Sequence, residues 1–161
     1  MTNSLHFRRA RPEEAPLLAE MTMQGLYHWG YEEKFPGLME EFRQENLPTA
    51  SYIEQSPVYC LVEGGRLTGY YGLVVNEEDQ FVDLRYFFLD TAVIGRGYGR
   101  RLWLDVLARA RELGFDRLRI VSDPAAVGFY QAMGASLERE HVVQPGFALG
   151  IMWYDLGPGE A

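Results

Sequence analysis

Three glycines alternate with other residues in the turn Gly95-Arg96-Gly97-Tyr98-Gly99-Arg100, which lies between an apolar run and an amphipathic run. Because glycine has no Cβ atom, an anion can come close to the backbone of such a turn. If the amphipathic run is a helix, its dipole and its free N–H groups favour negative charge at the same point. Arg96, Arg100 and Arg101 add positive charge. The turn is therefore predicted to bind a pyrophosphate or a similar anion.

The spacing of the glycines excludes two common phosphate-binding motifs. The dinucleotide fingerprint G-x-G-x-x-G needs its third glycine at position 100, where the chain has Arg100. A P-loop ends in Gly-Lys followed by Ser or Thr, and this tripeptide does not occur in the sequence. On the glycines alone, an ordinary flexible turn between a strand and a helix remains the alternative.

The turn and a second segment, Ser122 to Gly134, together resemble the acyl-CoA-binding signature of the GNAT acetyltransferase superfamily. In the first motif, [QR]-x-x-G-x-[GA], Gly97 and Gly99 occupy the fixed positions, and Ile94 replaces Gln or Arg. The second motif is usually N-x-x-A-x-x-F-Y-x-x-x-G-F. Here Asp123 replaces the Asn and Ala135 replaces the last Phe. Two motifs in this order are more specific than either one alone.

The resemblance implies acetyl-CoA as the cosubstrate and transfer of its acetyl group to an amine. It also implies that the strand backbone at Phe87 to Leu89 bonds the pantetheine arm. The residues that would bind the cosubstrate are Phe87, Phe88, Leu89, Gly95, Arg96, Gly97, Tyr98, Gly99, Arg100, Asp123, Phe129 and Tyr130.

Acetyl transfer to an amine needs a base, an oxyanion donor and an acid for the leaving thiolate. Tyr130 stands at the tyrosine of the second motif and is the candidate acid; the alternative is an ordinary core tyrosine. Asp83 lies on the strand before the turn, where some family members carry a glutamate base, and is the candidate base. An Asp83–Arg85 ion pair on a solvated face is the alternative. Other candidates for the base are Glu32, Glu33, His28, Glu140, His141 and water.

The resemblance also implies where the acceptor binds. Three parts of the chain would line that pocket: the aromatic segment Tyr27 to Phe35, the strand at Asp83, and the turn from Val143 to Ala148. Aromatic rings together with Glu32 and Glu33 can hold a cationic amine. The same side chains can equally pack as a loop core or a dimer surface.

The apolar patterns predict the elements that position these residues. Strands are predicted at Leu5–Arg9, Val58–Glu63, Leu67–Val75, Phe81–Leu89, Arg117–Val121, Leu137–Val143 and Ala148–Asp155. Helices are predicted from Pro12 to Leu26, around Leu38 to Phe42, from Arg101 to Leu113 and from Ala125 to Met133, with Gly25 to Pro36 as an aromatic loop. This order indicates an α/β fold, and the resemblance implies a GNAT fold: a mixed, mostly antiparallel sheet of about seven strands with about four helices.

Length and composition limit the class of protein. At 161 residues, the whole chain is predicted to form a single acetyltransferase domain. No apolar run has the length of a membrane span and no secretory leader is recognisable, so a cytoplasmic protein is expected. Cys60, the only cysteine, lies in an apolar strand pattern and is predicted to be buried rather than nucleophilic. Three scattered His and one Cys argue against a metal site.

The formal net charge of −8 disfavours nucleic-acid binding. The charge is uneven, since residues 1–54 contain nine acidic and five basic residues, whereas residues 94–119 contain seven Arg and three acidic residues. This pattern fits an anionic cosubstrate and a cationic acceptor. Arginines paired on a helix surface are the alternative. The acceptor, the acyl chain length and the oligomeric state, including a homodimer, stay open.

The sequence is compatible with three functions. The motif pair favours an acetyl-CoA-dependent N-acetyltransferase that acts on a small molecule or a protein through a ternary complex. The departures at Ile94, Asp123 and Ala135 favour a non-catalytic acyl-CoA-binding module. A generic nucleotide-phosphate binder that uses only the glycine turn is the third.

Overall fold

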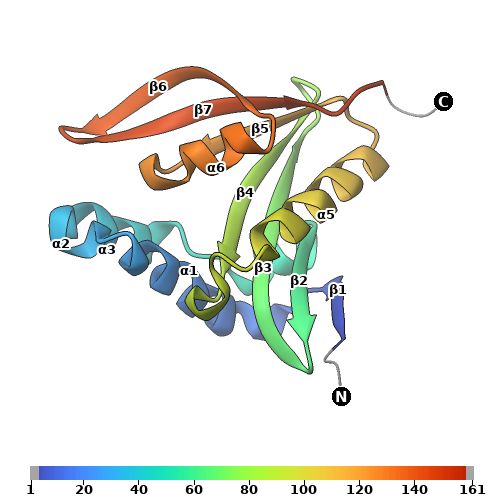
Figure 1. Cartoon of the computed structure of the whole chain (residues 1–161), viewed down its shortest axis with the longest axis horizontal. Coiled ribbons are helices and arrows are strands. Elements are labelled where there is room, and N and C mark those ends of the chain that lie inside the picture. Colours follow the sequence, from blue (N-terminus) through green and yellow to red (C-terminus); the bar gives the residue numbers. More distant parts are fainter. Residues whose placement is uncertain (1–3, 159–161) are drawn as a thin grey trace. The chain divides into compact units, whose positions relative to one another are not determined.

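The structure, a computed structural model, describes residues 4–158. These residues form seven strands, six α-helices and three short 3-10 helices (Figure 1). The strands are β1 (Leu5–Arg9), β2 (Val58–Glu63), β3 (Arg66–Asn76), β4 (Phe81–Leu89), β5 (Arg117–Ser122), β6 (Ser136–Gln144) and β7 (Phe147–Asp155). The α-helices are α1 (Ala15–His28), α2 (Tyr31–Lys34), α3 (Pro36–Glu45), α4 (Ala50–Gln55), α5 (Tyr98–Glu112) and α6 (Val127–Ala132), and the 3-10 helices are η1 (Pro12–Glu14), η2 (Thr91–Val93) and η3 (Pro124–Ala126).

The strands form one mixed sheet in the order β1-β2-β3-β4-β5-β7-β6. β1 with β2, β2 with β3, β5 with β7 and β6 with β7 are antiparallel pairs, whereas β4 pairs with β5 in parallel. A parallel pair needs a crossover, and α5 supplies it between β4 and β5. The crossover places the glycine turn after the carboxyl end of β4 and at the start of α5. The predicted α/β class, mixed sheet and seven strands are confirmed.

Contacts divide the chain into two compact units. The first comprises Met1–Gly72 and Tyr86–Leu102, and the second comprises Leu73–Arg85 and Trp103–Ala161. In the first unit, helix residues such as Leu18 and Ile53 pack with strand residues such as Val58 and Tyr70. In the second unit, Trp103 is 2% exposed, and its ring lies 5.8 Å from that of Tyr130 and 5.4 Å from that of Tyr154. Truncating a buried aromatic of this size costs about 3–5 kcal/mol of stability.

The segment from Gly25 to Pro36, predicted to be an aromatic loop, is largely helical. α1 continues to His28, and Tyr31–Lys34 forms α2. Gly25 lets Phe88 pack against α1, because a Cβ atom at Gly25 would lie 2.8 Å from Phe88 Cδ1. The loop prediction is wrong because it takes Gly25 as the end of a helix. Gly25 lies within the helix, where the close approach of Phe88 requires a residue without a side chain.

Within residues 4–158 there are two more α-helices than expected, and both are short. One is α2, and the other is α4, which follows Pro48. Thr49 starts α4, because its hydroxyl accepts a hydrogen bond of 3.1 Å from the Tyr52 backbone N–H. Apolar periodicity is hard to recognise over so few residues, whereas the capping threonine is a signal that the sequence contains.

Candidate active site

The glycine turn has open space on its backbone. Gly95 and Gly97 have φ angles of +85° and +83°, a left-handed conformation that side-chain-bearing residues rarely adopt. A Cβ atom placed on either glycine would meet no atom within 4 Å, so packing does not explain these glycines. The first bond of α5 runs from Arg101 N–H to Gly97 O at 3.3 Å. The N–H groups ahead of it have no partner within the helix. A phosphate fits these free donors and this open space.

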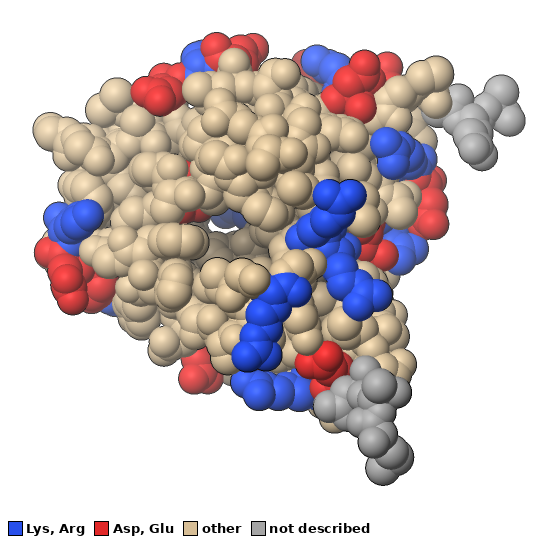
Figure 2. All heavy atoms as spheres, viewed as in Figure 1, with Lys and Arg blue, Asp and Glu red and all other residues tan. Residues whose placement is uncertain are grey.

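The charge around the turn also fits an anion. Arg96, Arg100 and Arg101 are exposed, and none of them forms an ion pair with another described residue. The first turn of α5 contains no acidic residue. Each cation near the positive end of a helix dipole costs about 0.3–1 kcal/mol, which a bound anion offsets. Figure 2 shows Lys and Arg side chains gathered in the region that α5 occupies in Figure 1.

Four side chains anchor the two ends of the turn; one is the predicted Tyr98, and the other three, Glu63, Arg66 and Asp90, were not anticipated from the sequence. Asp90 precedes it, and its Oδ1 accepts a hydrogen bond of 2.9 Å from Ala92 N–H, which holds the pKa of this carboxyl below its usual value. Arg66 binds the other Asp90 oxygen at 2.6 Å. At the far end, the Tyr98 hydroxyl donates to the Glu63 carboxylate at 2.8 Å. No local pattern relates these partners, since they are 24 and 35 residues apart in the sequence.

The side chains at the end of β4 pack into the first unit. The ring of Phe88 stacks on that of Tyr70 at 6.1 Å and lies against Gly25. Leu89 packs beside Gly69, where an added Cβ would lie 2.8 Å from Leu89 Cδ2. Phe87, like Phe88 and Leu89, is half-buried. A role for Phe87–Leu89 in binding the pantetheine arm therefore concerns the backbone rather than these packed side chains.

Tyr130 lies on α6 with a buried ring. The residue is 5% exposed, and its ring meets that of Phe129 edge to face at 5.3 Å. Burial raises the pKa of the Tyr130 hydroxyl above its ordinary value, and the nearby Asp123 carboxylate raises it further. Asp123 lies at the start of η3, and its backbone carbonyl accepts a bond from Ala126 N–H at 3.2 Å. The second motif thus brings Asp123, Phe129 and Tyr130 together, with a phenol that keeps its proton.

Asp83 is held by an arginine on the neighbouring strand. Its two carboxylate oxygens accept hydrogen bonds from Arg119 Nε at 3.1 Å and from Arg119 Nη2 at 2.8 Å. The two residues are directly opposite in the parallel pairing of β4 with β5. Asp83 is therefore ion-paired, but with Arg119, a residue that the alternative of an Asp83–Arg85 pair did not name. Arg119 also lies over the Phe81 ring, at 4.7 Å from its centroid.

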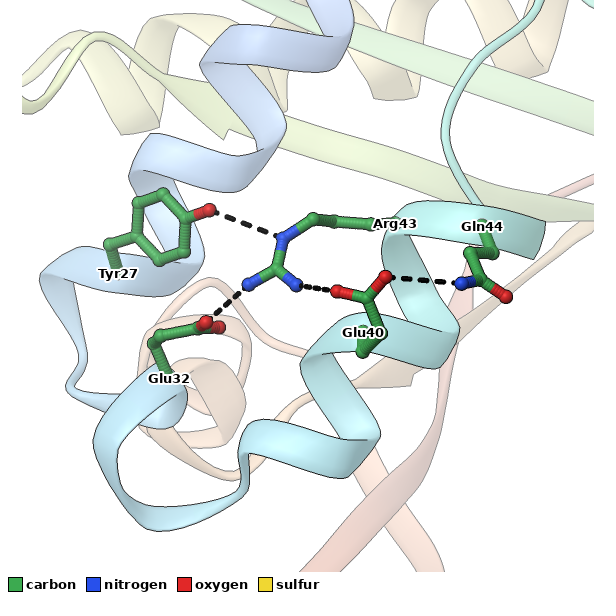
Figure 3. Close-up of polar contacts among 5 residues, drawn as sticks. All are labelled: Tyr27, Glu32, Glu40, Arg43 and Gln44. Carbon is green, nitrogen blue, oxygen red and sulfur yellow. Dashed lines mark hydrogen bonds and ion pairs between the residues drawn. The ribbon is translucent and has the colours of Figure 1, made fainter.

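Tyr27 and Glu32, in the largely helical segment around Tyr27 to Phe35, join a polar network with side chains of α3 (Figure 3), while Tyr27 and Trp29 stay exposed. Arg43 on α3 binds Glu32, Glu40 and the Tyr27 hydroxyl, and Gln44 donates to Glu40 at 3.1 Å. Glu32 Oε2 is buried and has no hydrogen-bond partner within residues 4–158.

The other candidate bases have different surroundings. Glu33 is exposed, and the exposed His28 ring meets the Trp29 ring edge to face at 4.8 Å. Glu140 and His141 are exposed on β6, a strand at the end of the sheet order. None of these four is buried, so Glu32, with its sheltered oxygen, is the most distinctive of the alternatives to Asp83.

Cys60 is buried, as predicted. It lies in the core of the first unit, and burial raises the pKa of its thiol to about 12, which leaves no thiolate for attack at neutral pH. Among the described residues, no three His, Cys, Asp or Glu side chains are grouped in a way that could hold a metal ion. None of the helices within residues 4–158 combines the length and the apolar character needed to cross a bilayer.

The predicted site residues fall into two groups. The first unit contains Phe87, Phe88, Leu89 and the turn from Gly95 to Arg100. The second unit contains Asp83, Asp123, Phe129 and Tyr130. Each group is assembled within its own unit: the open glycine turn in one, and a buried phenol near a carboxylate in the other.

Known proteins resemble this chain in sequence and in fold. The model of the acetyltransferase (GNAT) family matches residues 23–135, which confirms the resemblance seen in the two motifs. No curated protein sequence matches the chain significantly.

Solved structures share the fold at low sequence identity. The PaiA N-acetyltransferase of Thermoplasma acidophilum, solved with coenzyme A, has a TM-score of 0.78 at 15% identity over 94% of this chain and 99% of that one. A GCN5-related N-acetyltransferase of Rhodopseudomonas palustris gives 0.75 at 17% identity over 96% and 98%. The ribosomal-protein-S18-alanine N-acetyltransferase of Escherichia coli gives 0.69 at 15% identity over 95% and 94%. These likenesses confirm the predicted GNAT fold.

Proposed function

Because the chain belongs to the GNAT acetyltransferase family, we propose that it is an N-acetyltransferase that moves an acetyl group from acetyl-CoA to an amine of a small molecule or a protein. The family match supports acetyl transfer in general and acetyl-CoA as the cosubstrate. The observation that carries the proposal is the glycine turn, with its open backbone and three exposed arginines. We further propose that residues 1–161 form one acetyltransferase domain.

In the proposed reaction, both substrates are bound at once and the amine attacks the thioester directly. Acetyl-CoA supplies the activated acetyl group, and the turn from Gly95 to Arg100 binds its pyrophosphate. As the new C–N bond forms and the C–S bond breaks, the Tyr130 hydroxyl gives its proton to the leaving sulfur and regains one from solvent. The position of Tyr130 at the tyrosine of the second motif supports this role, and a phenol carries its proton at neutral pH, as a general acid must before each turnover.

The proton on the attacking amine needs an acceptor, because most alkylamines are protonated at neutral pH. Asp83 is the proposed base, acting directly or through a water. Its bond to Arg119 fixes the direction of the carboxylate, and each carboxylate oxygen has more than one lone pair to offer. The competing explanation is that the Asp83–Arg119 ion pair has only a structural role. The pH dependence of the reaction rate distinguishes this role from that of a base.

A cationic acceptor is supported by the polar network on α1, α2 and α3. Among residues 4–158, no donor reaches the buried Oε2 of Glu32, although Arg43 binds its Oε1. A buried acceptor without a hydrogen bond is costly, and an amine N–H is a suitable donor for it. We therefore propose that the acceptor carries a positive charge or several N–H groups.

Ligand binding and turnover test the proposal separately. Millimolar acetyl-CoA should raise the melting temperature, because a ligand that binds only the native state stabilises it. Release of coenzyme A is then measured with a panel of primary amines. Absence of stabilisation by acetyl-CoA rejects the proposal. Binding without turnover of any amine identifies a non-catalytic acyl-CoA-binding module, and tighter binding of ATP than of coenzyme A identifies a general nucleotide-phosphate binder.

A further inference from the structure

We infer that the β2–β3 hairpin holds the glycine turn in its binding conformation, so that Glu63 and Tyr98 are positioning residues for acetyl-CoA. The inference rests on the proposed function, because it concerns how the same turn binds its ligand. Two contacts carry it: Tyr98 with Glu63, and Asp90 with Arg66. These four residues, all in the first unit, are called the hairpin clamp below.

The hairpin presents two neighbouring side chains to the two ends of the turn. Gly64 and Gly65, with φ angles of +57° and +79°, form the tight connection that places Glu63 directly opposite Arg66. Arg66 Nη2 bonds Asp90 Oδ2 at 2.6 Å, before the turn. Tyr98 bonds both Glu63 oxygens, at 2.9 and 2.8 Å, after it. The whole segment between Asp90 and Tyr98 is therefore fixed at both ends by one hairpin.

A segment of this composition needs such support. Gly95, Gly97 and Gly99 give the turn more conformational freedom than other residues would. Without external contacts, binding a phosphate would have to order this backbone, and the lost entropy would weaken affinity. A turn that is already held in place avoids that loss. Preorganisation by the hairpin clamp explains why the turn can combine free backbone donors with a defined shape.

The two contacts differ in strength. The Arg66 side chain is 67% exposed, and ion pairs in water contribute little. The Tyr98–Glu63 bond is partly buried and its acceptor is ionised, so it is the stronger of the two. The Glu63 carboxylate also lies close to a site for an anion, where its charge alone would repel phosphate. Its presence there is explained if its role is to hold Tyr98.

Calorimetric titration with acetyl-CoA tests the clamp. Tyr98→Phe and Glu63→Ala should each raise the Kd about ten-fold, as expected for the loss of one charge-assisted hydrogen bond. Glu63→Gln should raise the Kd less than Glu63→Ala does, because the amide oxygen still accepts a bond from Tyr98, although without the charge of the carboxylate. The Tyr98→Phe/Glu63→Ala double variant should be no weaker than either single variant. In turnover assays, KM for acetyl-CoA should rise while kcat stays unchanged.

Tyr86→Phe is the matched control. It removes another tyrosine hydroxyl bond of the first unit, 2.7 Å to Asn46 O after α3, and should lower the melting temperature without changing the Kd. Unchanged binding in Tyr98→Phe and Glu63→Ala would overturn the inference. Weaker binding in Tyr98→Phe alone would overturn it too, because the hydroxyl would then touch the ligand itself. If the wild type binds no acetyl-CoA, the proposed function fails, and the clamp with it.

Discussion

The side-chain oxygen atoms of Tyr130 and Asp83 have different surroundings. The Tyr130 hydroxyl belongs to a buried residue, and burial together with the Asp123 carboxylate raises its pKa. The Asp83 oxygens both accept hydrogen bonds from one guanidinium, that of Arg119. The first arrangement keeps a proton on the phenol at neutral pH, and the second fixes a carboxylate in one direction. The proposed acid must carry a proton at the working pH, and the proposed base must present an oriented carboxylate.

Tyr130→Phe should lower kcat much more than it weakens binding of acetyl-CoA. The ring and its contact with Trp103 stay, and only the hydroxyl is lost. General acid catalysis is typically worth about 10²–10⁴-fold in rate. Steady-state kinetics together with calorimetric Kd values measure both effects. An unchanged kcat would remove Tyr130 from the chemical step, or would mean that another step limits turnover.

Asp83→Asn should lower the rate most at neutral pH, and the loss should shrink as pH rises. The amide cannot accept the proton of the ammonium, but at high pH more of the amine is already neutral. The pH–rate profiles of the variant and the wild type show this directly. Parallel profiles would mean that Asp83 is not the base, and Glu32, Glu140 and His28 would be tested next.

Arg119→Gln is the control for the Asp83 prediction. It breaks the same ion pair but leaves the carboxylate in place. If Asp83 is the base, this variant keeps the wild-type shape of the pH–rate profile. If the pair is only structural, both variants lower the melting temperature alike and neither changes the profile.

At the scale of the elements, the glycine turn depends on backbone conformation rather than on packing. Gly97 has a φ of +83° and open space beyond it. Gly114, two residues after the end of α5, has a φ of +90°, and an added Cβ there would also meet nothing within 4 Å. A side-chain-bearing residue at Gly97 or at Gly114 would therefore strain the backbone to a similar degree. A bound ligand is expected beside Gly97 but not beside Gly114.

Gly97→Ala should abolish most acetyl-CoA binding while the protein still folds. The added methyl group would occupy the space that the pyrophosphate needs, in addition to straining the backbone. Gly114→Ala should lower the melting temperature by a similar amount and leave the Kd unchanged. Calorimetry and thermal melting on both variants separate the two causes. Equal Kd values for Gly97→Ala and the wild type would show that the turn does not bind the phosphates.

The elements that the sequence predicted well are those with a strong local pattern. All seven strands were expected close to their observed bounds, and Gly134 ends the short α6 as predicted, with Ala135 N–H bonded to Tyr130 O at 2.9 Å. The course of the chain after Gly25 was missed because the reason for that glycine, the ring of Phe88, is distant in sequence. The partner of Asp83 was missed for the same reason, since Arg119 is 36 residues away.

For the whole molecule, buried acidic groups with raised pKa values control stability at high pH. The Cys60 thiol has a pKa of about 12 instead of 9.0, and the hydroxyls of Tyr70 and Tyr130 lie above their ordinary value of 10.0. The unfolded chain releases these protons at the ordinary values, while the native chain keeps them. Above about pH 9 the unfolded state therefore binds fewer protons, and the free energy of unfolding falls as pH rises.

Cys60→Ala should make this alkaline decline shallower. Between about pH 9 and pH 10, where the thiol of the unfolded chain ionises ahead of most of its tyrosines, the slope of the free energy of unfolding against pH should lose up to about 1.36 kcal/mol per unit. Urea unfolding of the wild type and the variant at a series of pH values measures the two slopes. Identical slopes would contradict the raised pKa of the thiol.

The burial of Cys60 has a practical consequence for following the protein in solution. A thiol that is 0% exposed and keeps its proton can react with an alkylating reagent only after the structure around it opens. Because the chain has one cysteine, the rate of its alkylation reports a single opening event in the core of the first unit. The native protein should also give no signal of its own with a chromogenic thiol reagent. The coenzyme A released at each turnover can then be measured with this reagent without a background signal from the protein.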